Sequence, residues 1–185
     1  MKRIAILLCV VLLLTGCSGK NQEMDRAMNL RSKLLAKAVS FDAQITADYG
    51  DKTYSFTMNC KADIQGNLTF TVIEPEIISG ISGTVSATGG KLKFDDVALA
   101  FDLMADGQFS PVSGPWLLMK TLRSGYLTSC CKEGENFRIS IDDSYDDDAL
   151  HLDIWLDGED VPIRGEIIWQ GRRLLTIGVK NFTFL

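Results

Sequence analysis

Strict alternation of apolar and polar residues is the feature that most constrains the fold of this chain. It recurs in four stretches: TYSFTMNC at 53–60, LTFTV at 68–72, FRISI at 137–141 and LHLDIWL at 150–156. A period of two places one set of side chains on a buried face and the other in water, which is typical of antiparallel strands. Turn signals such as Gly66-Asn67, Gly89-Gly90 and Gln170-Gly171 punctuate the chain. The pattern predicts roughly ten strands joined mostly by tight hairpins, with no strand–helix–strand repeat.

Two segments depart from this alternation and predict helices. Residues 22–39 carry apolar side chains at steps of three and four, which is the spacing of an amphipathic helix ending near Ser40. The apolar positions are Met24, Ala27, Met28, Leu34, Leu35 and Ala38. The stretch SPVSGPWLLMKTLRSGYL at 110–127 predicts a short helix with Pro115 in its first turn and Gly125 after its end. This second helix is apolar almost all round, so it must pack into the concave side of the sheet or cover a cavity.

The first residues indicate where the protein is located. Lys2 and Arg3 precede the uncharged run 4–14, which is too short to span a membrane and is typical of a secretory signal peptide. The residues Leu-Thr-Gly-Cys at 14–17, which begin at the end of this run, resemble the lipobox of bacterial lipoproteins. This resemblance implies cleavage before Cys17 and a diacylglyceryl group on its sulfur. Two acyl chains make a stable anchor, so we expect a domain held at the outer face of the cell membrane.

The remaining chain has the length of one domain and an acidic balance. We expect a signal peptide at 1–16, a lipidated tether at 17–21 and a single domain at 22–185. Loss of Lys2 and Arg3 with the signal peptide changes the formal net charge from −5 to −7. An acidic chain of this kind argues against binding to nucleic acid and provides no polybasic patch for a membrane.

Three cysteines remain after Cys9 leaves with the signal peptide and Cys17 is lipidated. If Gly134-Glu135 forms a hairpin tip, Cys130 lies opposite Ile139 and points inward, while Cys131 lies opposite Arg138 and points outward. Cys60 is also on an inward face. Two alternatives follow: a Cys60–Cys130 disulfide, which the oxidising environment outside the cytoplasm allows, or two reduced, buried thiols.

No pattern in the chain indicates an enzyme or a metal protein. DDSYDDD at 142–148 concentrates five carboxylates, but its spacing differs from that of a calcium loop and favours a solvated hairpin loop. His151, the only histidine, alternates onto the polar face with Asp153. One histidine supplies neither a zinc site nor a triad with clear partners, and we expect no cofactor, metal or catalytic residue.

The N-terminal helix, the long meander and the apolar helical insert behind a lipobox together resemble the LolA/LolB superfamily of lipoprotein-handling proteins. Residues 31–85 and 110–127 carry the resemblance, which is sharper to LolA-like lipoproteins of Firmicutes, of clostridial type. It implies an α+β fold in which a strongly curved antiparallel half-barrel sheet is covered by helices. It also implies a hollow that shelters acyl chains. Our candidate lining residues are Phe56, Met58, Phe70, Trp116, Met119 and Leu122.

The same residues are equally suited to an ordinary core, which leaves two functions open. The first is a lipoprotein that binds a lipid or acyl chain in the hollow of the half-barrel. The second is a structural or regulatory lipoprotein that holds a protein partner in the cell envelope or in spore germination, or forms a homodimer, without a lipid cargo. An apolar tunnel under residues 115–125 would favour the first, and a filled core with an exposed apolar patch would favour the second.

Overall fold

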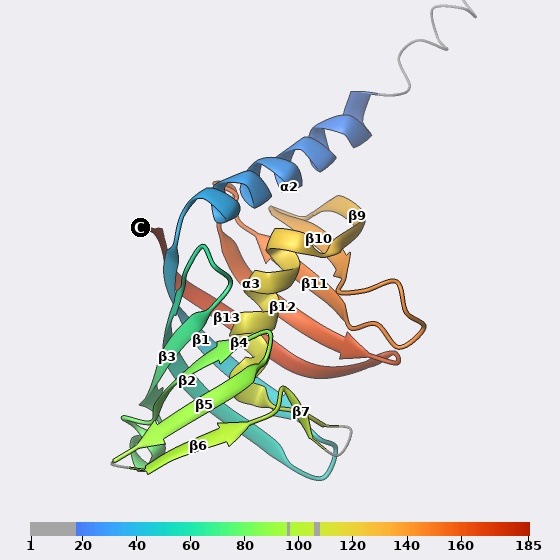
Figure 1. Ribbon diagram of the computed structural model, residues 1–185. Coiled ribbons are helices and arrows are strands. Elements are labelled where there is room, and N and C mark those ends of the chain that lie inside the picture. Colours follow the sequence, from blue (N-terminus) through green and yellow to red (C-terminus); the bar gives the residue numbers. More distant parts are fainter. Residues whose placement is uncertain (1–17, 96, 106–107) are drawn as a thin grey trace, which may run out of the picture.

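The structure, a computed structural model, describes residues 18–95, 97–105 and 108–185. Cys17 and the proposed signal peptide lie outside the described residues. These residues form two helices and one large antiparallel sheet of eleven strands, with a separate small hairpin (Figure 1). This arrangement confirms the antiparallel sheet that the alternating residues predict and the curvature that the resemblance implies, with eleven strands where about ten were expected.

The sheet consists of two meanders that meet in its middle. The first meander contains β1 (Val39–Asp48), β2 (Thr53–Ala62), β3 (Leu68–Glu74), β4 (Ser82–Ser86), β5 (Gly89–Phe94) and β6 (Val97–Phe101). The second contains β9 (Tyr126–Glu133), β10 (Asn136–Asp142), β11 (His151–Leu156), β12 (Pro162–Trp169) and β13 (Arg172–Phe184). The sheet order is β6-β5-β4-β3-β2-β1-β13-β12-β11-β10-β9, so the first and last strands are neighbours and, among the described residues, β6 and β9 are its edges.

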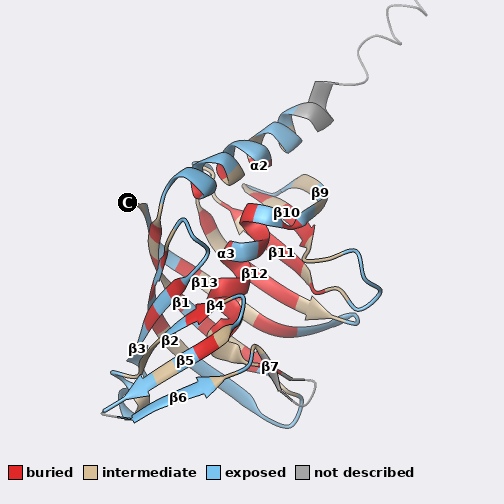
Figure 2. Cartoon of the chain, in the orientation of Figure 1, coloured by how far each residue is buried: buried red, intermediate tan, exposed pale blue. Residues whose placement is uncertain are grey.

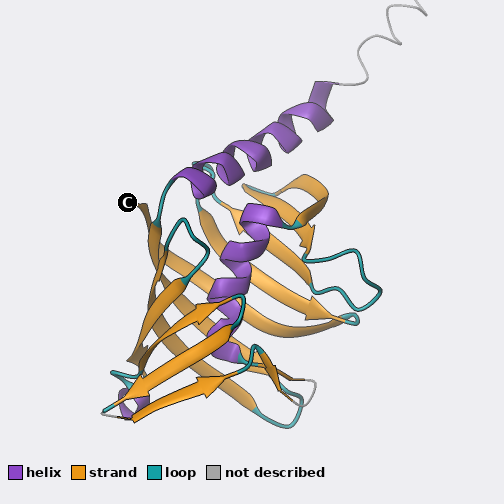
Figure 3. Ribbon diagram, viewed as in Figure 1, coloured by secondary structure: helices purple, strands orange, loops and turns teal. Residues whose placement is uncertain are grey.

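One short element lies within the first meander, and the others lie in the connection between the two meanders. The 3₁₀ turn η1 (Glu76–Ile78) follows β3, and the hairpin of β7 (Met104–Ala105) and β8 (Gln108–Phe109) follows β6. A second 3₁₀ turn, η2 (Pro111–Ser113), leads directly into the helix α3 (Gly114–Ser124), after which β9 begins. Figure 3 shows α3 lying between the two halves of the strand layer, with α2 (Ser18–Ala36) across one end.

The apolar helix α3 packs into the concave side of the sheet, as its sequence predicts, and nearly every residue along it is buried (Figure 2). Glycines let it approach closely. A Cβ at Gly165 of β12 would lie 2.8 Å from Leu118 Cδ1, and one at Gly114 would lie 3.0 Å from Leu175 Cδ1. The helix therefore closes the hollow against β12 and β13.

Gly125 ends α3, but not through the left-handed conformation common after helices. Its φ is −71°, and its N–H donates to Thr121 O at 2.8 Å. A Cβ there would meet Ile141 Cγ2 at 2.4 Å, so close packing against β10 is the reason for the glycine. The turn predicted at Gly89-Gly90 is wrong: these residues open β5, and the ring of Phe101 on β6 occupies the space above Gly90.

Helix α2 begins at Ser18, inside the predicted tether, and ends at Ala36, before the Ser40 that its sequence predicts. Its buried side chains are Ala27, Leu30 and Leu34, whereas Met24, Met28 and Leu35 are exposed. The predicted apolar face is therefore only partly correct. Two arginines explain the shift of face, because Arg26 pairs with Asp160 and Arg31 reaches the end of α3.

Candidate functional site

The six predicted lining residues separate into two groups in the structure. Met58, Phe70 and Leu122 are at most 3% exposed and belong to the core. Phe56, Trp116 and Met119 line grooves that remain at the two sides of α3. No tunnel lined by all six exists in the described part of the chain, because α3 fills the space in which we expected a cargo. Several concavities remain open to solvent, and two of them have mainly apolar linings.

The lower groove lies where the β1–β2 hairpin meets η1 and η2, and its volume is about 460 Å³. All but one of its lining side chains are aromatic or aliphatic, namely Tyr49, Tyr54, Phe56, Ile78, Phe109, Pro111 and Val112, and the exception is Ser110. The hydroxyl of Tyr49 donates to Phe109 O at 2.6 Å, which fixes that ring against β8. Burial raises the pKa of Tyr49, and the neighbouring Tyr54 adds to the effect, so the Tyr49 hydroxyl stays neutral at physiological pH.

The alternation along β2 explains this groove. Tyr54, Phe56, Met58 and Cys60 share one face, as predicted, but burial rises along the strand from the exposed Tyr54 to the fully buried Met58 and Cys60. The start of β2 extends beyond the reach of α3. Its apolar face therefore meets only η1 and η2, and a concave apolar surface stays in contact with water.

The upper groove lies along α3, between that helix and the β2–β3 and β4–β5 turns, and has a volume of about 500 Å³. Its apolar lining residues are Leu35, Ala62, Ile64, Leu68, Trp116 and Met119. The indole Nε1 of Trp116 donates to Gly66 O at 2.8 Å and so attaches the β2–β3 turn to α3. Two cationic side chains, Lys120 and Arg123, complete the lining.

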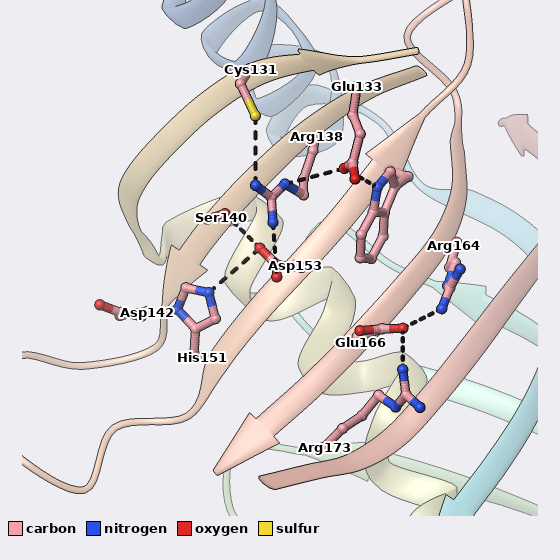
Figure 4. Close-up of polar contacts among 11 residues, drawn as sticks. Cys131, Glu133, Arg138, Ser140, Asp142, His151, Asp153, Arg164, Glu166 and Arg173 are labelled. Carbon is pink, nitrogen blue, oxygen red and sulfur yellow. Dashed lines mark hydrogen bonds and ion pairs between the residues drawn. The ribbon is translucent and has the colours of Figure 1, made fainter. Parts of the chain in front are cut away.

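The convex face of the second meander carries a dense polar network (Figure 4). Arg138 on β10 lies 3.4 Å from Glu133 Oε2 and 3.4 Å from Asp153 Oδ2. Asp153 also accepts a hydrogen bond from the hydroxyl of Ser140. Arg138 Nη2 donates a hydrogen bond to the Cys131 sulfur at 3.8 Å, and this bond is the main reason that the pKa of Arg138 is raised.

Asp153 stands directly opposite Glu166 of β12, although like charges in register repel each other. The structure neutralises each carboxylate separately. Arg164 and Arg173 both pair with Glu166, the latter at 2.9 Å. These long side chains cover the carboxylates, and both Asp153 and Glu166 are only 8% exposed on a face that would otherwise be wet.

The network brings a serine, a histidine and two aspartates together, but not in a catalytic order. His151 Nδ1 lies 2.7 Å from Asp142 Oδ1, and its Nε2 lies 3.5 Å from Asp153 Oδ1. A nucleophilic serine needs the histidine as its base. Here the Ser140 hydroxyl donates to Asp153 instead. The network therefore stabilises charges and does not activate the hydroxyl, and His151 lies on the polar face as predicted.

The hairpin register predicted around Gly134-Glu135 is confirmed, with Cys130 opposite Ile139 and Cys131 opposite Arg138.

The Cys60–Cys130 disulfide is not formed: all three described cysteines are free thiols. Cys60 lies on β2 and Cys130 on the edge strand β9, with β1, β13, β12, β11 and β10 between them in the sheet. Burial, with a smaller effect of the Asp42 charge, raises the pKa of the Cys60 thiol far above its usual value.

The acidic stretch at 142–148 forms the end of β10 and part of the irregular connection to β11, as expected for a hairpin loop. Within residues 18–95, 97–105 and 108–185, no three His, Cys, Asp or Glu side chains are grouped so as to hold a metal ion. In the same residues, no helix has the length and apolar character needed to cross a membrane.

No protein-family model matches the sequence, and a search of curated proteins finds no match. Solved structures with a similar fold include a LolA superfamily protein from Nitrosomonas europaea, with 8% identity, 86% of this chain and 93% of that chain covered, and a TM-score of 0.47. A putative outer membrane lipoprotein-sorting protein domain from Vibrio parahaemolyticus has 10% identity, 90% and 93% coverage, and a TM-score of 0.47. The lipoprotein LppX from Mycobacterium tuberculosis has 12% identity, 87% and 93% coverage, and a TM-score of 0.42. At such identities and TM-scores we assign neither family nor activity from them.

Proposed function

We propose that the protein is an extracytoplasmic lipoprotein, anchored through Cys17, that binds an acyl chain or a similar uncharged apolar group in the lower groove. The division into a signal peptide at 1–16, a lipidated tether from residue 17 and a single following domain belongs to this proposal. The observation that carries it is the lining of the groove, in which every side chain except that of Ser110 is aromatic or aliphatic and none is charged.

The physical basis is the exposed apolar surface. Tyr54 is 49% exposed although its ring points to the same side of β2 as the core residues. Phe56 and Ile78 pack only partly against the core. An acyl chain removes such surface from water, with a gain of about 25 cal/mol for each Å² of apolar area. A concave, mostly apolar surface with a few polar atoms at its edge is typical of small-molecule sites.

The test is native mass spectrometry of the protein purified from the membranes of its own host. We expect the mature chain to start at a diacylated Cys17 and to retain a further lipid mass. Phe56→Asp places a carboxylate in the groove and should abolish retention of that lipid. Ser55→Asp adds the same charge on the exposed, opposite face of β2 and should retain it.

The second candidate is the partner-binding lipoprotein, which an exposed apolar patch favours. Phe94, Val97 and Leu99 are each at least 49% exposed on β5 and the edge strand β6. An open apolar edge strand is a template for pairing with another chain. A tight homodimer or hetero-complex without lipid in the same spectra would support this candidate and contradict acyl-chain binding. Equal lipid retention by Phe56→Asp and wild type would also contradict the lower groove as the site.

A further inference from the structure

The upper groove differs from the lower one in its charge. Lys120 and Arg123 line it, and no carboxylate side chain is among its lining residues. The chain as a whole has a formal net charge of −5, so a concavity whose charged lining residues are both cations differs from its surroundings. The upper groove also combines these two cations with apolar walls, such as Leu35 and Ile64, which are both more than half exposed.

Arg123 is incompletely bonded where it lies. It is only 8% exposed, and its Nε donates to Leu34 O at 3.0 Å while its Nη1 donates to Asp63 O at 2.6 Å. Its Nη2 is buried and has no hydrogen-bond partner within the described part of the chain. Both of the partners that it does have are neutral carbonyls. Burial lowers the pKa of Arg123, and the charge on Asp63 opposes this only in part.

Lys120 lies one turn before Arg123 on the same side of α3. Its side chain is 41% exposed, and its ammonium lies 5.7 Å from the centre of the Trp116 ring. Its nearest carboxylate oxygen, Asp143 Oδ2, is 4.0 Å away, at the limit of an ion pair. An exposed lysine held this loosely can turn toward a new acceptor at little cost in free energy.

We propose that the upper groove binds the anionic head of an amphiphile. An acceptor oxygen that enters the groove gives Arg123 Nη2 its missing partner and gives the buried guanidinium a counter-charge. Lys120 Nζ approaches the same head from the open side. The apolar part of the ligand lies against Leu35, Ile64 and Met119. Buried donors without partners are costly, and charge-assisted bonds from arginine to carboxylate or phosphate are strong, so both favour occupancy.

The shared chemistry is an oxygen anion next to a short apolar chain, and either a carboxylate or a phosphate monoester could supply it. This site is separate from the lower groove in position and in ligand, so it does not depend on the proposed function. A neutral acyl chain can bind in the lower groove without an anion binding in the upper groove, and the reverse also holds, so each proposal can fail independently.

The experiment titrates the full chain, purified in a neutral detergent, with soluble probes. These are hexyl phosphate, hexanoate, hexanol and inorganic phosphate. The readout is the indole N–H resonance of Trp116, assigned by its loss in Trp116→Phe, because that N–H lies in the groove wall. We expect a saturable shift with one or both hexyl anions, and the stronger of the two identifies the type of head. No shift with either anion, or equal shifts with hexanol, would overturn the proposal.

Inorganic phosphate decides whether the apolar wall contributes. We expect it to bind at least tenfold more weakly than the preferred hexyl anion, because burial of a hexyl chain adds about 0.8 kcal/mol for each CH₂ group. Equal affinity would show a simple counter-ion site and would refute the amphiphile.

Three variants test the two cations. Arg123→Gln should weaken binding of the hexyl anion about tenfold or more, since a hydrogen bond to a charged group contributes on the order of 1.5–3 kcal/mol. Lys120→Gln, at an exposed position where folding is not at risk, should weaken it severalfold. Lys132→Gln removes an exposed charge on β9, outside the groove, and should have no effect. Unchanged affinity in Lys120→Gln and in folded Arg123→Gln would refute the site.

Discussion

Arg31 connects the N-terminal helix α2 to α3, the helix that lies in the concave side of the sheet. Its Nε donates to Leu122 O at 2.8 Å, and its Nη2 donates to Gly125 O at 2.8 Å and to Thr121 O at 3.4 Å. These carbonyls end α3, where the unpaired C=O groups and the helix dipole favour a cation. Substitution of Arg31 by Met keeps most of the apolar length of the side chain and removes every one of these bonds.

The size of the effect follows from the two short bonds. A hydrogen bond to a charged group contributes about 1.5–3 kcal/mol, and the bond of 3.4 Å adds little. Two opposing effects reduce the sum. Burial lowers the pKa of Arg31, with a smaller opposite effect of Cys130, which shows that the charged form loses hydration. The freed carbonyls can also bind water at this half-buried site. We therefore expect Arg31→Met to lower the free energy of unfolding by about 2 kcal/mol, which is roughly 4–8 °C in Tm.

Urea unfolding of the purified protein, followed by circular dichroism, measures this loss as a lower midpoint at unchanged slope. Arg31→Lys keeps the positive charge but removes the branched guanidinium that donates to two carbonyls. It should therefore show about half of the loss in free energy of unfolding. Arg172→Met is the matched control, because Arg172 is 55% exposed and lies 4.0 Å from its carboxylate partner, Asp48 Oδ1. It should change stability by no more than about 0.5 kcal/mol. Equal effects of Arg31→Met and Arg172→Met would refute the role given to Arg31.

Two further predictions concern the end of α3 and the β2–β3 turn. Gly125→Ala should destabilise the protein by about 1–3 kcal/mol, because its Cβ would lie 2.4 Å from Ile141 Cγ2, whereas Gly158→Ala, with no atom within 4 Å, should be neutral in the same urea assay. Despite burial, which acts in the opposite direction, hydrogen bonds led by those from Asn67 hold the pKa of Asp63 below its usual value. Its carboxylate therefore stabilises the fold fully above its unfolded pKa of about 3.9, and this contribution is lost as the pH falls through the lower folded value. Below about pH 4, the free energy of unfolding in the urea assay should fall less steeply in Asp63→Asn than in wild type. An equally steep fall would contradict this role of Asp63.

Much of the local structure could be read from short stretches of sequence. The register at Gly134-Glu135 is correct residue by residue because a two-residue hairpin fixes its own pairing. Helix α3 lies within the predicted 110–127 stretch because Pro115 and Gly125 limit its length. Gly89-Gly90 shows where such reasoning fails. The β4–β5 turn lies two residues earlier, at 87–88, and Gly90 lies within β5 against the ring of Phe101.

The candidate grooves were predictable only in part. Phe56, Trp116 and Met119 could be selected as lining residues because they share faces with core residues, although Trp116 and Met119 are themselves buried. Lys120 and Arg123 were missed, although their spacing of three on one helix is visible in the sequence. What the sequence does not show is that both hydrogen-bond partners of Arg123 are backbone carbonyls. The charged network around Asp153 was missed for a similar reason, since its members come from β9, β10 and β11.

By itself, the sequence determined an antiparallel, hairpin-rich sheet, one apolar helix inside it and the pairing of neighbouring strands. These follow from periodicity and turn chemistry, which act over a few residues. Only the tertiary structure decided that β1 and β13 join the two meanders, that five strands separate the strands of Cys60 and Cys130, and that α3 fills the hollow. These outcomes depend on close packing between residues distant in the chain, such as Leu118 against Gly165, and a local pattern contains no information about such partners.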